Sequence, residues 1–343
     1  MKLFTILSLG CSILFSGGYA LAADKTPVNF LQHPKAQQFI IEMIEKHHFK
    51  KTDMYKWFAS IKPRPDIIEA ISHPAEATKP WYLYRKIFLI ERRIQGGAEF
   101  MKTHKADLMR AEKQTGVPAE IIVAILGVET LYNRYKGRHF VLESLSTLAF
   151  DYPKRSRFFR SELEQFLLLA REEGVDPLTL KGSYAGAMGG PQFISSSFRR
   201  YAIDFNNDGK RDIWNNTTDM IGSVANYFKV HGWQPQQNII INTKISGDQI
   251  DSLLKQGIKP KHSLKELTAR GVVYKHNAAE NIPENTKAAL IKFDMEKEPV
   301  YRLGFKNFYV ITRYNHSPLY AMAVVELSEA IIKRTKKLEN AKH

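Results

Sequence analysis

The chain has 343 residues, of which 44% are hydrophobic, 11% aromatic and 25% charged, a length typical of about two domains. This composition excludes a disordered or fibrous chain, and the single cysteine excludes a disulfide framework or a cysteine-based zinc site. Fifty Lys and Arg residues against 35 Asp and Glu give a net charge of +15, which favours a partner or surface rich in negative charge.

The N-terminus has the pattern of a removable export signal. Lys2 supplies a positive charge, residues 3–14 are nearly all apolar or small, and a small-x-small cleavage site ends at Ala22. We therefore expect a signal peptide over residues 1–22 and a mature protein that is soluble in the periplasm. The alternative is a lipid anchor on Cys11, although Ser8 stands where a leucine is expected.

In the rest of the chain the pattern of hydrophobic residues changes twice. Residues 23–237 repeat apolar residues at helical spacing with breaks at prolines. Residues 238–300 hold short β-branched stretches between polar turns, which predicts a small β-containing subdomain. Over residues 301–343 the helical pattern returns and ends in a helix from Pro318 to about Lys337. The fold class is therefore mainly α, as a helical α+β protein.

Glu129 ends a continuous apolar run, and it is the first candidate for chemistry. On a helix its carboxyl lies on the same stripe as Ile122 and Ile125. Partial desolvation there disfavours the anion and suits the group to donating a proton. The alternative is a glutamate at a helix end that pairs with Arg134 or Lys136, and for an arbitrary glutamate this structural role is the commoner one.

A glycine-rich segment from Lys181 to Phe193 is the second candidate. Its glycines let the backbone approach a ligand closely, while Ser183, Tyr184 and Gln192 offer hydroxyl and amide groups that suit sugars. The segment has no phosphate-loop pattern. A tight helix–helix turn explains the glycine spacing equally well.

The third candidate is an EF-hand-like loop over residues 204–219. A glycine stands at its sixth position, and oxygen ligands match the first, third, fifth, seventh and ninth positions: Asp204, Asn206, Asp208, the carbonyl of Lys210 and Asp212. Asn215 replaces the bidentate glutamate at the twelfth position, so Asp219 would have to supply the missing carboxylate. We expect a structural Ca²⁺ ion of weak affinity, and the alternative is an Asx-rich turn without an ion.

Tyrosines and one amide form the fourth group, because aromatic faces stack on sugar rings while hydroxyls and amides bond their substituents. Spacing alone does not distinguish these residues from amphipathic core: Tyr84, Tyr227, Tyr314, Asn315 and Tyr320.

Five segments in chain order resemble the membrane-bound lytic murein transglycosylase B family, over about residues 30–337. They are Ile125–Thr130, Leu145–Pro153, Gly182–Gly189 with Gln192-Phe193, Ile221–Trp233, and Ile311–Ser317 continued by Tyr320–Val324. The resemblance implies a lysozyme-like catalytic region within residues 23–237, with residues 301–343 returning to its groove. It also implies one catalytic carboxylate, Glu129, and a set of glycan-binding residues: Tyr84, Ser183, Gln192, Tyr227, Tyr314, Asn315 and Tyr320. Some family members hold calcium in the matching loop, where this chain has one extra residue before Asp219.

The reaction implied by this resemblance is lytic cleavage of peptidoglycan, in cell-wall remodelling or turnover. Glu129 would protonate the oxygen between N-acetylmuramic acid and N-acetylglucosamine, and then take the proton of the C6 hydroxyl as a 1,6-anhydro ring closes. No cofactor is required for this chemistry. The expected partners are glycan strands and other cell-wall enzymes, and nucleic acid is disfavoured because export removes the chain from it.

Two rivals stay open at this point. One is a hydrolytic muramidase that uses an aspartate such as Asp151 as its second carboxylate. The other is a non-catalytic murein-binding scaffold, which an intact Glu129 argues against.

Overall fold

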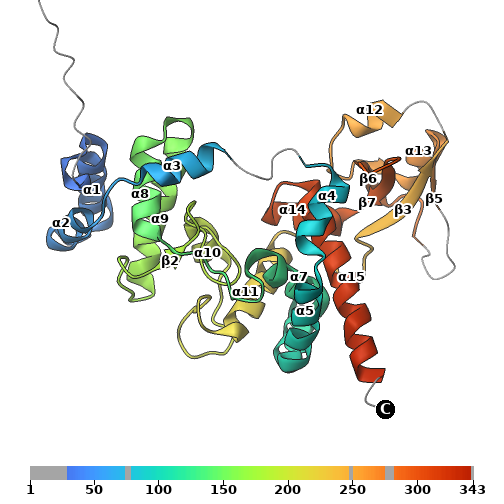
Figure 1. Cartoon of the computed structure of the whole chain (residues 1–343), viewed down its shortest axis with the longest axis horizontal. Coiled ribbons are helices and arrows are strands. Elements are labelled where there is room, and N and C mark those ends of the chain that lie inside the picture. The colour runs from blue at the N-terminus through green and yellow to red at the C-terminus, as the bar shows by residue number, and fades with distance from the viewer. Residues whose placement is uncertain (1–28, 74–78, 247–249, 275–281, 341–343) are drawn as a thin grey trace, which may run out of the picture.

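The computed structural model describes residues 29–73, 79–246, 250–274 and 282–340. The expected export signal and Cys11 lie outside these residues. The molecule is elongated, with the N-terminal helices at one end and an antiparallel sheet at the other (Figure 1). The mainly helical α+β fold class is confirmed. Within the described parts of the chain, none of the helices has the length and apolar character needed to span a bilayer.

The N-terminal end is a bundle in which the first helices of the chain pack with two later ones. The first elements are η1 (Phe30–Gln32), α1 (Pro34–His47), α2 (Lys51–Ser60) and α3 (Pro65–Ser72), and the later helices are α8 (Val141–Asp151) and α9 (Ser156–Glu172). Proline opens both α1 and α3, where its missing N–H costs nothing. The rings of Phe30, Phe39 and Phe58 lie 5.7–6.5 Å from that of Phe150, so aromatic packing joins the bundle.

The centre of the molecule is built around α7 (Ala119–Thr130). All of residues 119–128 except Glu120 are buried, which makes this a core helix rather than an amphipathic one. The sequence predicts Pro118 in the first turn of this helix, but in the structure Pro118 is its N-cap. The surrounding helices are α4 (Trp81–Phe88), α5 (Glu91–Thr103), α6 (Lys105–Thr115), α10 (Ser195–Tyr201), α11 (Thr217–Val230), α14 (Lys306–Tyr314) and α15 (Pro318–Asn340).

A five-stranded antiparallel sheet forms the other end, in the order β4-β6-β7-β3-β5. The strands are β3 (Ile240–Ile245), β4 (His262–Ser263), β5 (Val272–Tyr274), β6 (Lys287–Phe293) and β7 (Val300–Gly304), and two short helices accompany them, α12 (Ile250–Leu254) and α13 (Leu264–Ala269). Leu303 of β7 lies opposite Ile241 and Leu290 and belongs to a second apolar core with Leu253 and Leu267. The sheet therefore continues to Gly304, past the expected boundary at 300.

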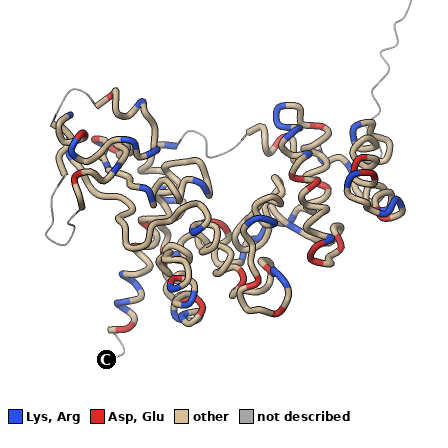
Figure 2. The backbone as a smooth tube through the Cα atoms, turned by 180° about the vertical axis from the view of Figure 1, so that it is seen from behind, with Lys and Arg blue, Asp and Glu red and all other residues tan. Residues whose placement is uncertain are grey.

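Positive charge is spread along the molecule. Lys and Arg occur from end to end and alternate with Asp and Glu (Figure 2). The excess of basic residues therefore belongs to no single element of the fold.

Candidate active site

Glu129 lies in the last turn of α7 and is partly buried. The hydroxyl of Tyr320 donates a hydrogen bond to its Oε1 atom at 2.5 Å. Tyr320 is 3% exposed and lies in the first turn of α15, the helix that packs beside α7 (Figure 1). A charge-assisted O–H···O⁻ bond of this length is among the stronger ones in proteins. The packing of two helices thus fixes one carboxylate oxygen against one phenol.

Two tyrosines stay neutral beside this carboxyl group. Burial raises the pKa of Tyr320 well above its usual value, with Glu129 the next largest cause and Tyr84 a smaller one. Burial also raises the pKa of Tyr314, and Glu129 adds to that effect. Their rings lie 6.5 Å apart and nearly parallel, at 9°. Two neutral phenols therefore flank the Glu129 carboxyl, which is the side chain of this cluster suited to general acid–base chemistry.

Tyr227 extends the cluster, with its ring 4.7 Å from that of Tyr314. Burial raises the pKa of Tyr227 as well. The hydroxyl of Tyr227 donates to the carbonyl of Arg313, and the hydroxyl of Tyr314 donates to that of Pro191, both at 2.6 Å. Since these protons are already used, neither hydroxyl is left to donate to a ligand. Tyr227 is buried with its ring stacked on His231 at 4.0 Å, whereas Tyr314 is only partly buried.

The other two members of the tyrosine group differ in exposure. Tyr84 is 4% exposed on α4 and packs against Phe88 and Trp81 at ring distances of 5.2 and 6.3 Å. Asn315 follows α14 and is exposed. The structure thus buries Tyr84 near Tyr320 and leaves Asn315 on the surface beside Tyr314.

The glycine-rich segment is a loop between β2 (Lys181–Gly182) and α10, not a helix–helix turn. Ser183 Oγ accepts from the backbone N–H groups of Ala185 and Ala187 at 3.2 and 3.0 Å. Gln192 adopts a left-handed backbone, with φ of 53°. Its side-chain amide donates to the carbonyls of Gly189 and Lys136 at 2.9 and 3.3 Å. Both predicted sugar-binding side chains therefore also shape the loop.

This loop is tied to the end of α7. Thr130 Oγ1 donates to the carbonyl of Gly190 at 3.0 Å, and its side chain is 1% exposed. A Cβ on Gly189 would come within 2.4 Å of the carbonyl of Ile213, at a φ of 67°, so only glycine fits there. The loop is thus held at a fixed distance from the helix that carries Glu129.

Asp151, the second carboxylate of a hydrolytic alternative, is elsewhere. It ends α8 and its Oδ1 lies 3.1 Å from Nε2 of His33, between η1 and α1. These elements belong to the N-terminal bundle, whereas α7 lies in the centre of the molecule (Figure 1). Asp151 therefore does not share a site with Glu129.

The EF-hand-like loop folds around its own carboxylates. Asp204 accepts from the N–H groups of Asp208 and Gly209 at 3.1 and 2.7 Å. The Oδ1 of Asn206 accepts from Asp208 at 3.2 Å, and Asp208 accepts from the N–H of Lys210 at 3.0 Å. These bonds are those of an Asx-rich turn, and they arrange the oxygens at alternate positions of the loop.

Asp219 closes the loop from inside. It is fully buried, and its two oxygens accept from the N–H groups of Phe205 and Asp212 at 2.8 and 2.9 Å. Burial raises the pKa of Asp219, and nearby Asp204 adds to it. A buried carboxylate beside a second one suits a cation. Among the described residues no three Asp, Glu, His or Cys side chains converge on one point, so such a cation would also need Asn206 and the Lys210 carbonyl.

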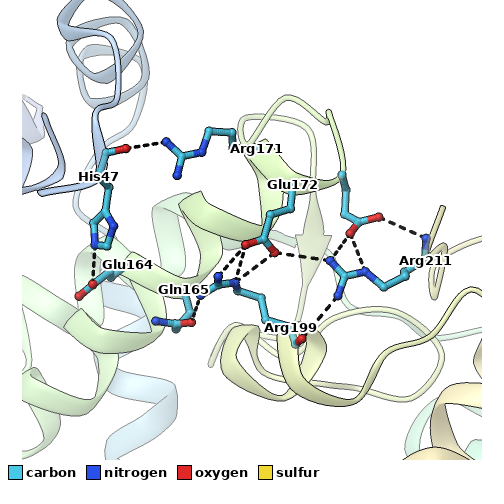
Figure 3. Close-up of polar contacts among 8 residues, drawn as sticks. His47, Glu164, Gln165, Arg171, Glu172, Arg199 and Arg211 are labelled. Carbon is cyan, nitrogen blue, oxygen red and sulfur yellow. Dashed lines mark hydrogen bonds and ion pairs between the residues drawn. The ribbon is translucent and has the colours of Figure 1, made fainter. Parts of the chain in front are cut away.

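Ion pairs attach this loop to the helical bundle (Figure 3). Arg211 binds Glu172 and Glu173 at the end of α9, and Arg199 of α10 binds the same Glu172. At the other side of α9, Glu164 lies 2.7 Å from His47 of α1. The network links the loop, α10, α9 and α1.

Two clefts lie away from Glu129. One of about 1360 Å³ separates the sheet from α15 and contains the 2.5 Å pair between Arg85 and Glu326. The other, of about 500 Å³, borders the EF-hand-like loop at Lys210 and the 136–137 turn. Neither is lined by Glu129 or by the tyrosine cluster.

Sequence reasoning missed Thr130 and the residues after it. Leu131, Tyr132 and Asn133 all have left-handed backbones, with φ of 50°, 59° and 69°, at a cost of roughly 1–2 kcal/mol for each non-glycine residue. A left-handed backbone after a helix is normally predicted from a glycine at that position. None of these three residues is glycine, so the sequence did not indicate the turn.

A mainly helical molecule with one partly buried glutamate at the end of its core helix, facing a glycine-rich loop, defines the class of lysozyme-like glycan-cleaving enzymes. The family described as "Transglycosylase SLT domain" matches residues 31–329, and the chain belongs to this family.

Three relatives are similar to this chain over most of its length. Membrane-bound lytic murein transglycosylase B of Escherichia coli strain K12 is 39% identical over 336 residues, 92% of this chain and 89% of the relative. Soluble lytic transglycosylase SltB1 from Pseudomonas aeruginosa is 47% identical, with a TM-score of 0.83 over 88% of this chain and 99% of its own. Escherichia coli Slt35 in complex with calcium is 38% identical, with a TM-score of 0.80 over 89% and 95%.

Proposed function

We propose that this protein is a lytic transglycosylase that cleaves the bond between N-acetylmuramic acid and N-acetylglucosamine in peptidoglycan and leaves a 1,6-anhydro end. The observation that carries the proposal is the pairing of Glu129 with Tyr320 at 2.5 Å in a cluster of neutral tyrosines. Membership of the transglycosylase family supports it, as does the name of the Escherichia coli relative.

One carboxyl group serves both halves of the reaction. Protonated Glu129 gives its proton to the glycosidic oxygen as the C1–O bond breaks. The N-acetyl group of the muramic residue stabilises the cation that develops at C1. The Glu129 carboxylate then takes the proton of the C6 hydroxyl, whose oxygen bonds to C1 and closes the ring. The atoms balance without water, and Glu129 ends protonated as it began.

Tyr320 steadies the carboxylate between these two steps. When Glu129 has lost its proton, the Tyr320 hydroxyl donates to Oε1, which leaves the other oxygen for the substrate. The glycan would contact Tyr314 and Tyr227, together with Asn315, Ser183 and Gln192. Tyr84 lies close enough to Tyr320 to add to the rise in its pKa.

The mass of the products separates lytic cleavage from hydrolysis. Purified peptidoglycan digested with the protein should give muropeptides one water lighter than those of a hydrolytic muramidase. Hydrated ends would favour the muramidase, even though Asp151 lies in another part of the fold. Binding of glycan without any cleavage would favour the scaffold.

A structural Ca²⁺ ion belongs to the proposal. Asp204, Asn206, Asp208, the Lys210 carbonyl and Asp219 would hold it, and its charge would compensate the buried Asp219. Support comes from the relative that was solved in complex with calcium. The ion would stabilise the loop, and no proton transfer above depends on it.

We place the mature protein in the periplasm, soluble after cleavage near Ala22, with a lipid anchor on Cys11 as the alternative that the name of the membrane-bound relative favours. Glycan strands are its substrate, and other cell-wall enzymes are its proposed protein partners. Residues 23–237 and 301–343 would form the catalytic groove, and residues 238–300 the accessory subdomain.

A further inference from the structure

The chain turns back immediately after Glu129 through the three left-handed residues Leu131, Tyr132 and Asn133. The last turn of α7 closes on this segment, since Leu131 N–H donates to the Gly127 carbonyl at 3.2 Å and Tyr132 N–H to the Leu126 carbonyl at 3.0 Å. An unfavourable backbone persists only where the surrounding structure holds it. The contacts that hold these residues therefore also fix the end of the helix.

The ring of Tyr132 occupies a slot made by three glycines. A Cβ on Gly96 or Gly97 of α5 would lie 3.0 or 2.5 Å from its atoms, and one on Gly127 of α7 would lie 2.6 Å away. The hydroxyl donates to the carbonyl of Arg93 at 2.7 Å, and the Arg93 guanidinium donates to the Gly127 carbonyl at 2.8 Å. Helices α5 and α7 thus meet across this one ring.

The other side of the segment is hydrogen-bonded to the glycine-rich loop and to the EF-hand-like loop. Asn133 N–H donates to Thr130 Oγ1 at 3.0 Å, and Thr130 Oγ1 donates to the Gly190 carbonyl at 3.0 Å. The Asn133 side chain donates to the Trp214 carbonyl at 3.1 Å. The residues that follow Glu129 are therefore fixed on two sides, by the contacts of Tyr132 with α5 and by the hydrogen bond of Thr130 to the glycine-rich loop.

We propose that Tyr132, seated in its three-glycine slot, is a positioning residue that holds the Glu129 carboxyl in register with Tyr320 and the glycine-rich loop. This inference rests on the proposed catalytic role of Glu129. In this role Tyr132 acts by setting where α7 ends and takes no part in the proton transfers. Burial raises the pKa of Tyr132, so its phenol remains a neutral donor to Arg93.

The substitution Gly96→Ala distinguishes a positioning role of Tyr132 from a contribution to the stability of the fold alone. Gly96 lies inside α5, and the new Cβ would meet only Tyr132 Cε2 at 3.0 Å and Cδ2 at 3.2 Å. Alanine is the better helix former, so the substitution should keep or raise the melting temperature. The ring must nevertheless move by a few tenths of an ångström, close to the tolerance of about 0.5 Å for a catalytic constellation.

The expected result is a kcat on peptidoglycan about three- to tenfold lower, with KM within about twofold of the wild type. The second arm places Gly96→Ala in a Tyr132→Leu background, where the ring is gone. There the glycine substitution should lower kcat no further, because the Cβ has nothing left to displace. Leu267→Ala, in the second apolar core, is the control that lowers the melting temperature without changing kcat.

Two outcomes overturn the inference separately from the proposed function. If Glu129→Gln is inactive but Gly96→Ala keeps wild-type kcat, or loses as much with Tyr132→Leu as without it, the positioning role is wrong and the catalytic one stands. If Glu129→Gln stays active in the same assay, the catalytic role fails and the positioning role fails with it.

Discussion

The phenol of Tyr320 and the carboxyl of Glu129 meet at 2.5 Å although 191 residues separate them in the chain. The contact exists because α15 returns at the end of the chain to pack along α7. It gives the glutamate a neutral donor that is itself too buried to ionise. A carboxylate held in this way can be formed and reprotonated without reorienting.

Replacing Glu129 with glutamine should abolish peptidoglycan cleavage. The amide keeps the shape of the side chain and can still accept the Tyr320 hydrogen bond, but it cannot carry a proton. The loss should exceed the roughly hundredfold often due to general acid–base catalysis, since the residue serves both halves of the reaction. Release of muropeptides measures the activity, and glycan binding with an unchanged melting temperature is the control. Activity within about tenfold of wild type would remove Glu129 from its role.

Tyr320→Phe should lower kcat by roughly tenfold while the melting temperature changes little. The ring stays in place and only the hydroxyl that donates to Glu129 is lost, which corresponds to a charge-assisted hydrogen bond of about 1.5 kcal/mol. Steady-state kinetics on soluble glycan fragments would measure it. Tyr201→Phe is a suitable control, because its hydroxyl lies 3.5 Å from Nε2 of His231 and its ring packs edge-on against Tyr227 at 4.8 Å. Equal effects of the two substitutions would contradict a specific role for Tyr320.

Features of the fold and the site could be predicted from the sequence where they depend on residues close together in the chain. The helix before Glu129 and the strand at Ala288–Phe293 are local patterns, and both appear in the structure. The EF-hand-like spacing is also local, but its loop shows the hydrogen bonds of an Asx-rich turn and the calcium ion stays a prediction. The pairing of Glu129 with Tyr320 is set by tertiary packing and has no spacing to reveal it. Tyr132 combines a left-handed backbone with a ring that fits between three glycines of two helices. This arrangement depends on tertiary packing, so the residues next to Tyr132 in the sequence do not reveal it.

The ion-pair network at the end of α9 should make stability depend on pH. Hydrogen bonding to Arg199 lowers the pKa of Glu172 from its usual 4.5. A lowered carboxyl pKa stabilises the fold above the ordinary value, and this stability is lost as the pH falls through the lowered value. Since the pair is partly exposed, Glu172→Gln should cost under about 1 kcal/mol.

Melting curves of Glu172→Gln and wild type should therefore differ by about 1 °C at pH 7 and converge well below pH 4.5, the ordinary value for this group. Glu45→Gln is the matched control, because Glu45 is exposed and forms no ion pair within the described residues. A difference that persists unchanged to the lowest pH would mean that the network does not contribute through charge.

Calcium should raise the melting temperature. An ion bound only by the folded loop stabilises it by mass action, by about 2.7 kcal/mol at a hundredfold excess over the dissociation constant. The effect should disappear in Asp204→Ala and Asp208→Ala, whereas cleavage of peptidoglycan should survive in chelator. A melting curve that is the same in chelator and in excess calcium would favour the Asx-rich turn that the hydrogen bonds of Asp204 already form.

Processing of the N-terminus decides where the protein acts. If cleavage follows Ala22, the mature protein should appear in the soluble periplasmic fraction, and Cys11→Ser should change nothing because the cysteine leaves with the signal. If Cys11 is lipidated, the same substitution should move the protein from the membrane fraction to the soluble one. Ser8 before the Leu9-Gly10-Cys11 segment and the better site at Ala22 favour the soluble form. Mass spectrometry of the mature N-terminus tests this directly: an acylated Cys11 would refute it even if Glu129 and Tyr320 behave as expected.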